Sequence, residues 1–206
     1  MISLRIGDCD VDIIPIIKGL VSEAEKVSSI YGKYEAYAVT LSIEEITALV
    51  NREELMDEHE LSEIDLVYAH HLSSFGEVES PTPAYCELID LCGKDGISVI
   101  PLDMDNEEFT TVFVDNVKTM EFVNEHRVAK KGMKKKFDMS SPEKFAIEWD
   151  EYINGVKGYA KISKIRDKYM AEQIVDIAKY RRTLLAVVEV ERINMILGHI
   201  NAMGNG

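Results

Sequence analysis

The sequence lacks the features that mark several large classes of protein. It has three cysteines in 206 residues and no Cys-x-x-Cys pair, which argues against a disulfide framework and against a thiolate zinc site. No apolar run approaches the roughly 18 to 20 residues that a membrane-spanning helix needs. The first residues show no cleavable signal pattern. We therefore expect a cytoplasmic protein with reduced, buried thiols.

Several short catalytic motifs are also missing. The chain contains no Gly-x-Ser-x-Gly elbow, no P-loop and no Gly-x-Gly-x-x-Gly turn. These absences argue against a serine hydrolase of the usual α/β type, a P-loop nucleotide hydrolase and a Rossmann dehydrogenase. His-Glu-x-x-His is absent as well, so the sequence offers no metal motif of fixed spacing.

Basic residues are scarce in the first half of the chain. Residues 1–110 carry 24 Asp and Glu against 6 Lys and Arg, whereas residues 111–206 carry 13 against 17, and the net charge is −14. This balance argues against nucleic acid as a partner, because phosphates would be repelled by most of the surface. The two halves could attract each other, within one chain or between two copies in a homo-oligomer. The simpler interpretation is that acidic loops keep the protein soluble.

Strand and helix patterns alternate along the chain. Short apolar runs predict five strands. They lie at 2–6, 35–41, 64–69, 97–102 and 184–190. The run at 184–190 is almost purely apolar, which is typical of a parallel strand covered on both faces. Asp12 is expected to cap a helix directly after the first strand. The pattern predicts an α/β fold with a mostly parallel sheet of about five strands flanked by helices.

Two amphipathic helices follow the fourth strand with no strand between them. They predict a helical hairpin at 106–158, inserted into a single α/β domain of residues 1–206.

Polar side chains follow the predicted strands, and the carboxyl ends of parallel strands are where such sheets bind ligands. Carboxylates at one edge suit Mg²⁺, Mn²⁺ or Zn²⁺, and a bound metal would lower the pKa of its water. The candidate metal ligands are Asp8, Asp10, Asp103, Asp105 and Glu191. The alternative is that they are ordinary loop residues and helix caps, as Asp105 would be.

His70 and His71 follow the third predicted strand, and either could act as a general base. Adjacent side chains on an extended chain point to opposite faces, so the two are not expected to bind one metal. The alternative for one of them is a hydrogen-bonded core histidine. Arg192, after the fifth strand, could hold an anionic group of a substrate.

Residues 127–136 carry six basic side chains in ten. They could contact RNA, an acidic lipid surface or the acidic half of another chain. The simpler interpretation is that cations favour the C-terminal end of a helix.

Four stretches resemble the TraB/PrgY proteins, in the wider group that includes the TIKI metalloproteases, the ChaN proteins and the erythromycin-esterase-like proteins. Arg166-Asp167 with the following Tyr169-Met170 resembles the family's Arg-Asp-x-x-Met helix, and 184–197 resembles its last strand. Segments 35–51 and 84–105 resemble its earlier strand and helix units. The resemblance implies an α/β scaffold. It suggests that Arg166 and Asp167 serve structure, for instance as an ion pair that braces the last helix against the sheet.

The chain departs from this family where the family keeps its functional residues. Asp10 replaces a histidine, Thr40 a carboxylate, Met104 an arginine, and Glu191-Arg192 a Gly-His pair. The resemblance therefore implies the scaffold without the reaction, and we expect a non-catalytic or regulatory protein that binds a small molecule, a peptide or a copy of itself. One alternative is a metal-dependent hydrolase with a rebuilt acidic site at the strand ends. A second is a binder of RNA or an anionic surface through 127–136.

Overall fold

The structure is a computed structural model that describes residues 1–54, 61–118, 121 and 125–204. Its described residues form a five-stranded sheet in the order β1-β2-β5-β3-β4. Strand β1 (Ile2–Ile6) is antiparallel to β2 (Cys9–Ile16). All other neighbours are parallel. The remaining strands are β3 (Ala36–Val39), β4 (Ile100–Pro101) and β5 (Thr183–Glu189). The predicted α/β class with a mostly parallel sheet is confirmed.

The first 16 residues form a hairpin, so the prediction of a helix capped by Asp12 is wrong. Gly7 has a φ of 57° at the turn between β1 and β2, a left-handed conformation that glycine adopts without strain. Asp12 lies within β2 and accepts hydrogen bonds from Ser3 and, at 2.6 Å, from the Tyr34 hydroxyl. The β-branched residues of this segment favour a strand, and they prevail over a helical spacing that includes Ile13 and Ile17.

The third predicted strand is also wrong, because residues 64–69 belong to helix α3 (Glu63–Leu72). The Ser62 hydroxyl caps this helix by accepting a hydrogen bond from the Asp65 backbone N–H at 3.1 Å. A short apolar run does not by itself distinguish a strand from a helix. The serine three residues before an acid was the local signal for a helix start.

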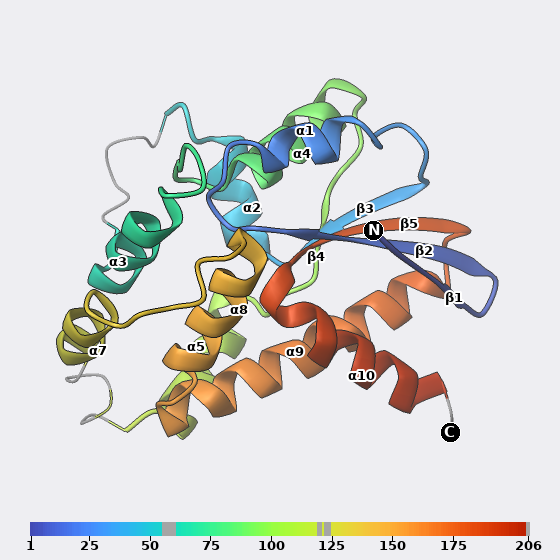
Figure 1. The fold of residues 1–206 in the computed structure, drawn as a ribbon. Coiled ribbons are helices and arrows are strands. Elements are labelled where there is room, and N and C mark those ends of the chain that lie inside the picture. The colour runs from blue at the N-terminus through green and yellow to red at the C-terminus, as the bar shows by residue number, and fades with distance from the viewer. Residues whose placement is uncertain (55–60, 119–120, 122–124, 205–206) are drawn as a thin grey trace.

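Helices cover both faces of the sheet (Figure 1). Helices α1 (Glu23–Ser28), α2 (Ile43–Val50) and α4 (Pro83–Lys94) pack on one face. Helices α9 (Lys157–Ala178) and α10 (Ile193–Gly204) pack on the other. Along β5, Leu184, Ala186 and Val188 face α9 and α10, whereas Leu185 and Val187 face the opposite layer. The apolar run predicted to be covered on both faces is therefore buried on both.

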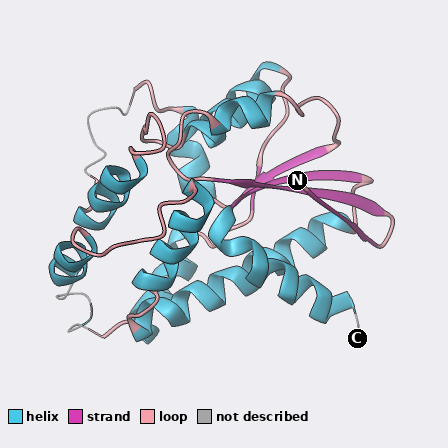
Figure 2. Cartoon of the chain, in the orientation of Figure 1, coloured by secondary structure: helices cyan, strands magenta, loops and turns pink. Residues whose placement is uncertain are grey.

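A third group of helices lies beyond the carboxyl ends of the parallel strands, as Figure 2 shows with Figure 1. It consists of α3, α7 (Glu125–Gly132) and α8 (Pro142–Ile153). Their buried cluster is rich in aromatic rings, among them Phe137, Phe145 and Trp149. Residue Val190, directly after β5, packs against this cluster. The third group therefore encloses the edge of the sheet at which a site is expected.

Between β4 and β5 the described residues form helices α5 (Asn106–Asn116), α7, α8 and α9 and no strand. Whether 106–158 is an insertion in a single domain stays a prediction. Of the helices in the described ranges, none combines the length and the apolar character required to cross a membrane.

Candidate functional site

Four of the predicted site residues lie at or near the carboxyl edge of the sheet. Asp103 and Asp105 follow β4, and Glu191 and Arg192 form part of the short helix η1 (Val190–Arg192) after β5. Asp105 caps α5, because its side chain accepts a hydrogen bond from the Glu108 backbone N–H at 2.8 Å. The capping alternative for Asp105 is thus confirmed.

Asp8 and Asp10 lie at the opposite edge, so the expectation that they sit beside Asp103 is wrong. Asp8 is in the turn of the N-terminal hairpin, and Asp10 is paired with Thr183 at the start of β5. Arg5 binds the Asp10 carboxylate at 2.6 Å. The hairpin reverses the chain, which places both acids at the amino ends of the parallel strands. In the described residues no group of three or more His, Cys, Asp or Glu side chains is arranged to hold a metal ion.

His70 and His71 lie in α3, and the strand end expected for them is absent from that segment. His71 Nε2 is 3.2 Å from the Gly132 carbonyl oxygen, and its ring packs against Phe137 and Phe145. His71 thus matches the alternative of a hydrogen-bonded histidine in an apolar cluster. His70 is exposed on the same helix.

One buried ion pair closes the edge beside β4. Asp103 is 7% exposed, and its two carboxylate oxygens accept hydrogen bonds from Arg166 Nε at 2.9 and 3.2 Å, with Arg166 Nη2 as a further donor. Its Oδ1 also accepts from the Met104 backbone N–H at 2.9 Å. Bidentate arginine contacts of this kind are strong and directional. The Asp103 carboxylate is therefore already bound within the chain.

A second charged group closes the edge behind β5. Arg192 Nη1 donates to Asp167 Oδ1 at 2.8 Å, and Arg192 Nε lies 3.6 Å from Glu189 Oε2. Glu189 Oε2 also accepts from the Thr40 hydroxyl, and Thr40 Oγ1 lies 2.7 Å from the Tyr85 hydroxyl oxygen. Glu189, Asp167 and Thr40 are all buried. This network connects the carboxyl ends of β3 and β5 with α4 and α9.

Glu191 forms no ion pair within 4.0 Å with any residue that the structure describes. Its Oε2 is buried and accepts no hydrogen bond from any described residue. Burial, and after it the charge of Glu189, raises the pKa of the Glu191 carboxyl from 4.5 to about 8. Burial likewise raises the pKa of Asp150 on the facing helix α8. Burial also raises the pKa of the Tyr68 hydroxyl, and the negative charges of Glu191 and Glu189 raise it further. A carboxyl with this pKa is mostly protonated at neutral pH.

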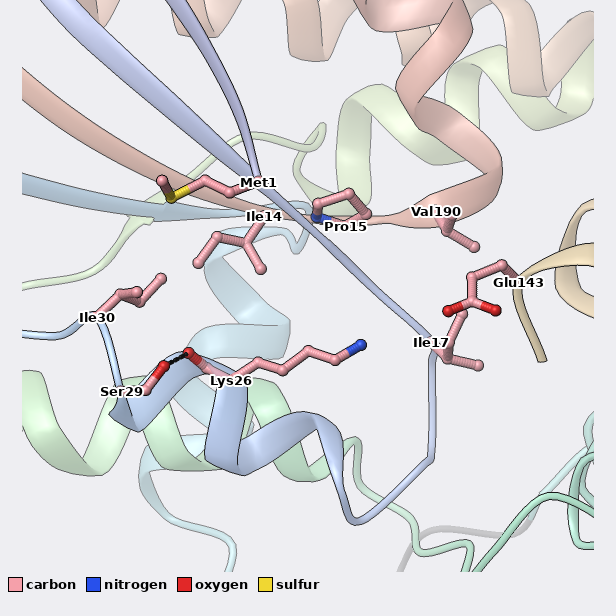
Figure 3. A pocket seen from close by; sticks show the side chains of 9 residues that line it. All are labelled: Met1, Ile14, Pro15, Ile17, Lys26, Ser29, Ile30, Glu143 and Val190. Atoms are coloured by element: carbon pink, nitrogen blue, oxygen red, sulfur yellow. Dashed lines mark hydrogen bonds between the residues drawn. The ribbon is translucent and has the colours of Figure 1, made fainter. Parts of the chain in front are cut away.

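A cavity of about 420 Å³ opens at the same edge, next to the end of β2. Most of its wall is aliphatic, and it includes Val190, the residue that follows Glu189 in the chain. Figure 3 shows Lys26 and Glu143 reaching into the space from α1 on one side and α8 on the other. The lining residues are Met1, Ile14, Pro15, Ile17, Lys26, Ser29, Ile30, Glu143 and Val190.

The two charged side chains of this cavity are held in place by different partners. Lys26 Nζ lies 2.6 and 2.8 Å from the two carboxylate oxygens of Glu23, which is 3% exposed. The backbone N–H of Glu143, then the Ser141 hydroxyl and the charge of Lys26, lower the pKa of the Glu143 carboxyl. Glu143 has no ion-pair partner within 4.0 Å among the residues that the structure describes. The cavity therefore combines an apolar wall with one cation and one anion.

Comparison with known proteins supplies no match. No family model, no curated protein and no solved structure matches the chain.

Sequence reasoning found part of this site and missed the rest. The resemblance singled out Arg166 and Asp167. Arg166 binds Asp103, which follows β4, and Asp167 binds Arg192, which follows β5. Glu189 was visible as a charge inside an apolar run, which indicates a buried and partnered carboxylate. Lys26 and Glu143 carried no local signal, because they occupy exposed helical positions that any charged residue could fill.

Proposed function

We propose that this chain is a non-catalytic protein that binds a small molecule or a short peptide at the carboxyl edge of its sheet, on a scaffold diverged from the TraB-like proteins. The observation that carries the proposal is the state of the acids at this edge. Asp103 is bound by Arg166, and Glu189 and Asp167 lie against Arg192. A hydrolase would need such carboxylates free to hold a metal or to activate water.

The burial of these pairs supports a structural role for them. Removing one partner from a buried ion pair leaves an uncompensated charge, which costs about 3 to 5 kcal/mol. The side chain of Asp103 is 5% exposed and that of Arg192 is 13% exposed. A substrate that displaced either arginine would have to offset that cost. These groups are therefore better suited to fixing the sheet edge than to exchanging ligands.

The cavity beside β2 supports binding. Small-molecule sites are typically concave, largely apolar, and supplied with a few fixed polar groups, with volumes of roughly 300 to 1,000 Å³. The cavity has about 420 Å³, six aliphatic or thioether side chains and three polar ones. It also lies at the edge where parallel sheets bind ligands.

A fragment screen monitored by ligand-observed NMR tests the proposal. Ser29 lines the cavity, and we expect Ser29→Trp to fill its mouth and abolish binding of any fragment seated there. Ser73→Trp is the matched control. Both serines are exposed helix C-caps whose hydroxyls donate to the carbonyl oxygen three residues earlier, at 2.8 Å for Ser29 and 2.7 Å for Ser73, but Ser73 does not line the cavity. Fragments that bind both variants equally would contradict the proposal.

A metal-dependent hydrolase is the alternative, and Glu191 is the observation that favours it. A carboxyl that keeps its proton near neutral pH can act as a general acid. We expect no turnover of nitrophenyl esters or phosphoesters above the buffer rate with added Mg²⁺, Mn²⁺ or Zn²⁺. Metal-dependent turnover that disappears in Glu191→Gln would establish the alternative. Asp103→Ala is less informative, because it also removes the ion-pair partner of Arg166, whose side chain is only 24% exposed.

A further inference from the structure

The cavity beside β2 holds two opposite charges that do not neutralise each other. Lys26 reaches in from α1 and Glu143 from the first turn of α8 (Figure 3). Lys26 is paired with Glu23 at 2.6 Å, so the contact that fixes the ammonium is made outside the cavity lining. No ion pair within 4.0 Å joins Lys26 to Glu143 in the described part of the chain. A ligand can therefore lie between the two.

The hydrogen-bonding capacity of both groups is only partly used. A lysine ammonium has three N–H donors, and two of them are directed at the Glu23 oxygens. The Ser29 hydroxyl donates to the Lys26 carbonyl oxygen at 2.8 Å and keeps its acceptor lone pairs. Glu143 is ionised, since its pKa is lowered, and its carboxylate can accept further hydrogen bonds. One unused donor and at least one unused acceptor thus belong to residues that line the same cavity.

The remaining wall selects for an aliphatic body. Ile14, Pro15, Ile17, Ile30 and Val190 provide branched or cyclic aliphatic surface. None of the described residues that line the cavity is aromatic, so these residues offer a ligand neither ring stacking nor cation–π attraction. The hydrophobic effect favours burial of a branched alkyl group against this wall.

We propose that this cavity binds a zwitterion with a branched aliphatic side chain, of the class of the α-amino acids leucine, isoleucine and valine. This inference rests on the proposed binding function and names its ligand class. The ligand carboxylate accepts from Lys26, the ligand ammonium donates to Glu143 and Ser29, and the alkyl group lies on the isoleucine wall.

Ligands with a single charge fit less well. Glu23, Lys26 and Glu143 together carry a net negative charge, so a carboxylate without an ammonium is repelled by Glu143. An amine without a carboxylate leaves the free donor of Lys26 unmatched when the cavity is filled. The Lys26 side chain is 50% exposed, so this donor stays bonded to solvent and contributes nothing to the binding of the amine. A zwitterion can bind Lys26 with its carboxylate and Glu143 with its ammonium at the same time.

Isothermal titration calorimetry with L-leucine tests the inference, with 3-methylbutylamine and 4-methylpentanoate as comparators that each lack one charge. We expect saturable leucine binding and at least about tenfold weaker binding of either comparator, as the loss of one charged hydrogen bond implies. Glu143→Gln should weaken leucine binding by about tenfold or more. Glu151→Gln, an exposed position on the same helix outside the lining, should leave it unchanged.

Lys26→Arg is the second variant, because it keeps the charge opposite buried Glu23 and so preserves the fold while moving the donors. We expect it to weaken leucine and 4-methylpentanoate binding and to leave 3-methylbutylamine binding unchanged. If the amine binds as tightly as leucine, or if Glu143→Gln has no effect, the zwitterion inference is overturned. If leucine fails but other fragments bind and are lost in Ser29→Trp, the ligand class is wrong and the proposed function survives. If no probe binds, both are overturned.

Discussion

Replacing Glu191 with glutamine tests the charge balance behind β5. The carboxyl is buried, its Oε2 has no hydrogen-bond partner among the described residues, and Arg192 is shared with Asp167 and Glu189. Glutamine keeps the shape and carries no charge at any pH. The variant therefore removes the charge of residue 191 and retains its packing.

The sign of the effect follows from the direction of the pKa change. The pKa of Glu191 is raised from 4.5 to about 8 in the folded protein, so the folded state holds the proton more tightly than the unfolded state. This group leaves stability intact below about pH 4.5 and lowers it progressively as the pH rises to about 8, beyond which its effect is constant. Glu191→Gln should thus gain stability relative to the native chain as the pH rises through this window.

The magnitude has an upper bound of about 5 kcal/mol, the free energy that corresponds to raising a carboxyl pKa from 4.5 to about 8. Two effects reduce it. Local relaxation lets water approach an ionised carboxylate, and the glutamine amide itself becomes a buried polar group without a partner, which costs about 1 to 3 kcal/mol. We expect a net gain of about 2 kcal/mol at alkaline pH.

Chemical denaturation of both proteins at about pH 5.5 and about pH 8.5 measures this difference. Comparing the variant with the native chain at each pH cancels the titration of the other groups. Glu151→Gln, exposed on α8, is the control for loss of a surface carboxylate. If the free-energy difference between Glu191→Gln and the native chain is the same at both pH values, Glu191 does not keep a proton in the folded state and the reasoning fails.

Three further predictions concern other parts of the molecule. Arg166→Met should lower the free energy of unfolding by about 3 to 5 kcal/mol, because it leaves buried Asp103 unpaired. Urea titration should show most of that loss recovered in the double variant with Asp103→Asn, and no recovery would exclude the pair as the cause. Gly158→Ala should lower the free energy of unfolding by about 1 to 3 kcal/mol in thermal denaturation. The added Cβ would lie 2.8 Å from a Glu121 carboxylate oxygen and 3.1 Å from the Asn116 carbonyl oxygen. An unchanged melting temperature would show that these neighbours move freely. Fluorescence anisotropy with single-stranded RNA should show no saturable binding at about 200 mM salt, because the net charge of −14 opposes it, and binding lost on reversing the charges of 127–136 would contradict this.

The fold was predictable where apolar patterns were long or locally capped. The continuous run at 184–190 predicted β5, and Ser42 with Glu45 predicted the start of α2, where both hydrogen bonds of the capping box are present. The apolar pattern gave the wrong element where a short segment was compatible with both the helical and the strand repeat. Ile13 and Ile17 fit a helical spacing, yet residues 9–16 form a strand, and 64–69 fit a strand but form a helix.

The charged network was harder to predict, because its partners are far apart in the chain. Arg166 and Asp103 are separated by 63 residues, and Arg192 and Asp167 by 25. Which arginine meets which carboxylate depends on strand order, and a single sequence does not contain that order. The hairpin shows the same dependence, since it alone moves Asp8 and Asp10 to the far edge.

The position of β5 in the sheet bears on how the protein is assembled. This strand lies between β2 and β3, which do not pair with each other, although it is the last of the five to be synthesised. Without β5, the ladders of this sheet reduce to two separate pairs, β1 with β2 and β3 with β4. Pairing over such long sequence separations is slow, and unpaired strand edges are prone to aggregation. We therefore expect a nascent chain stopped at residue 182 to remain without a continuous sheet, and the contact between Thr40 and Glu189 to form among the last.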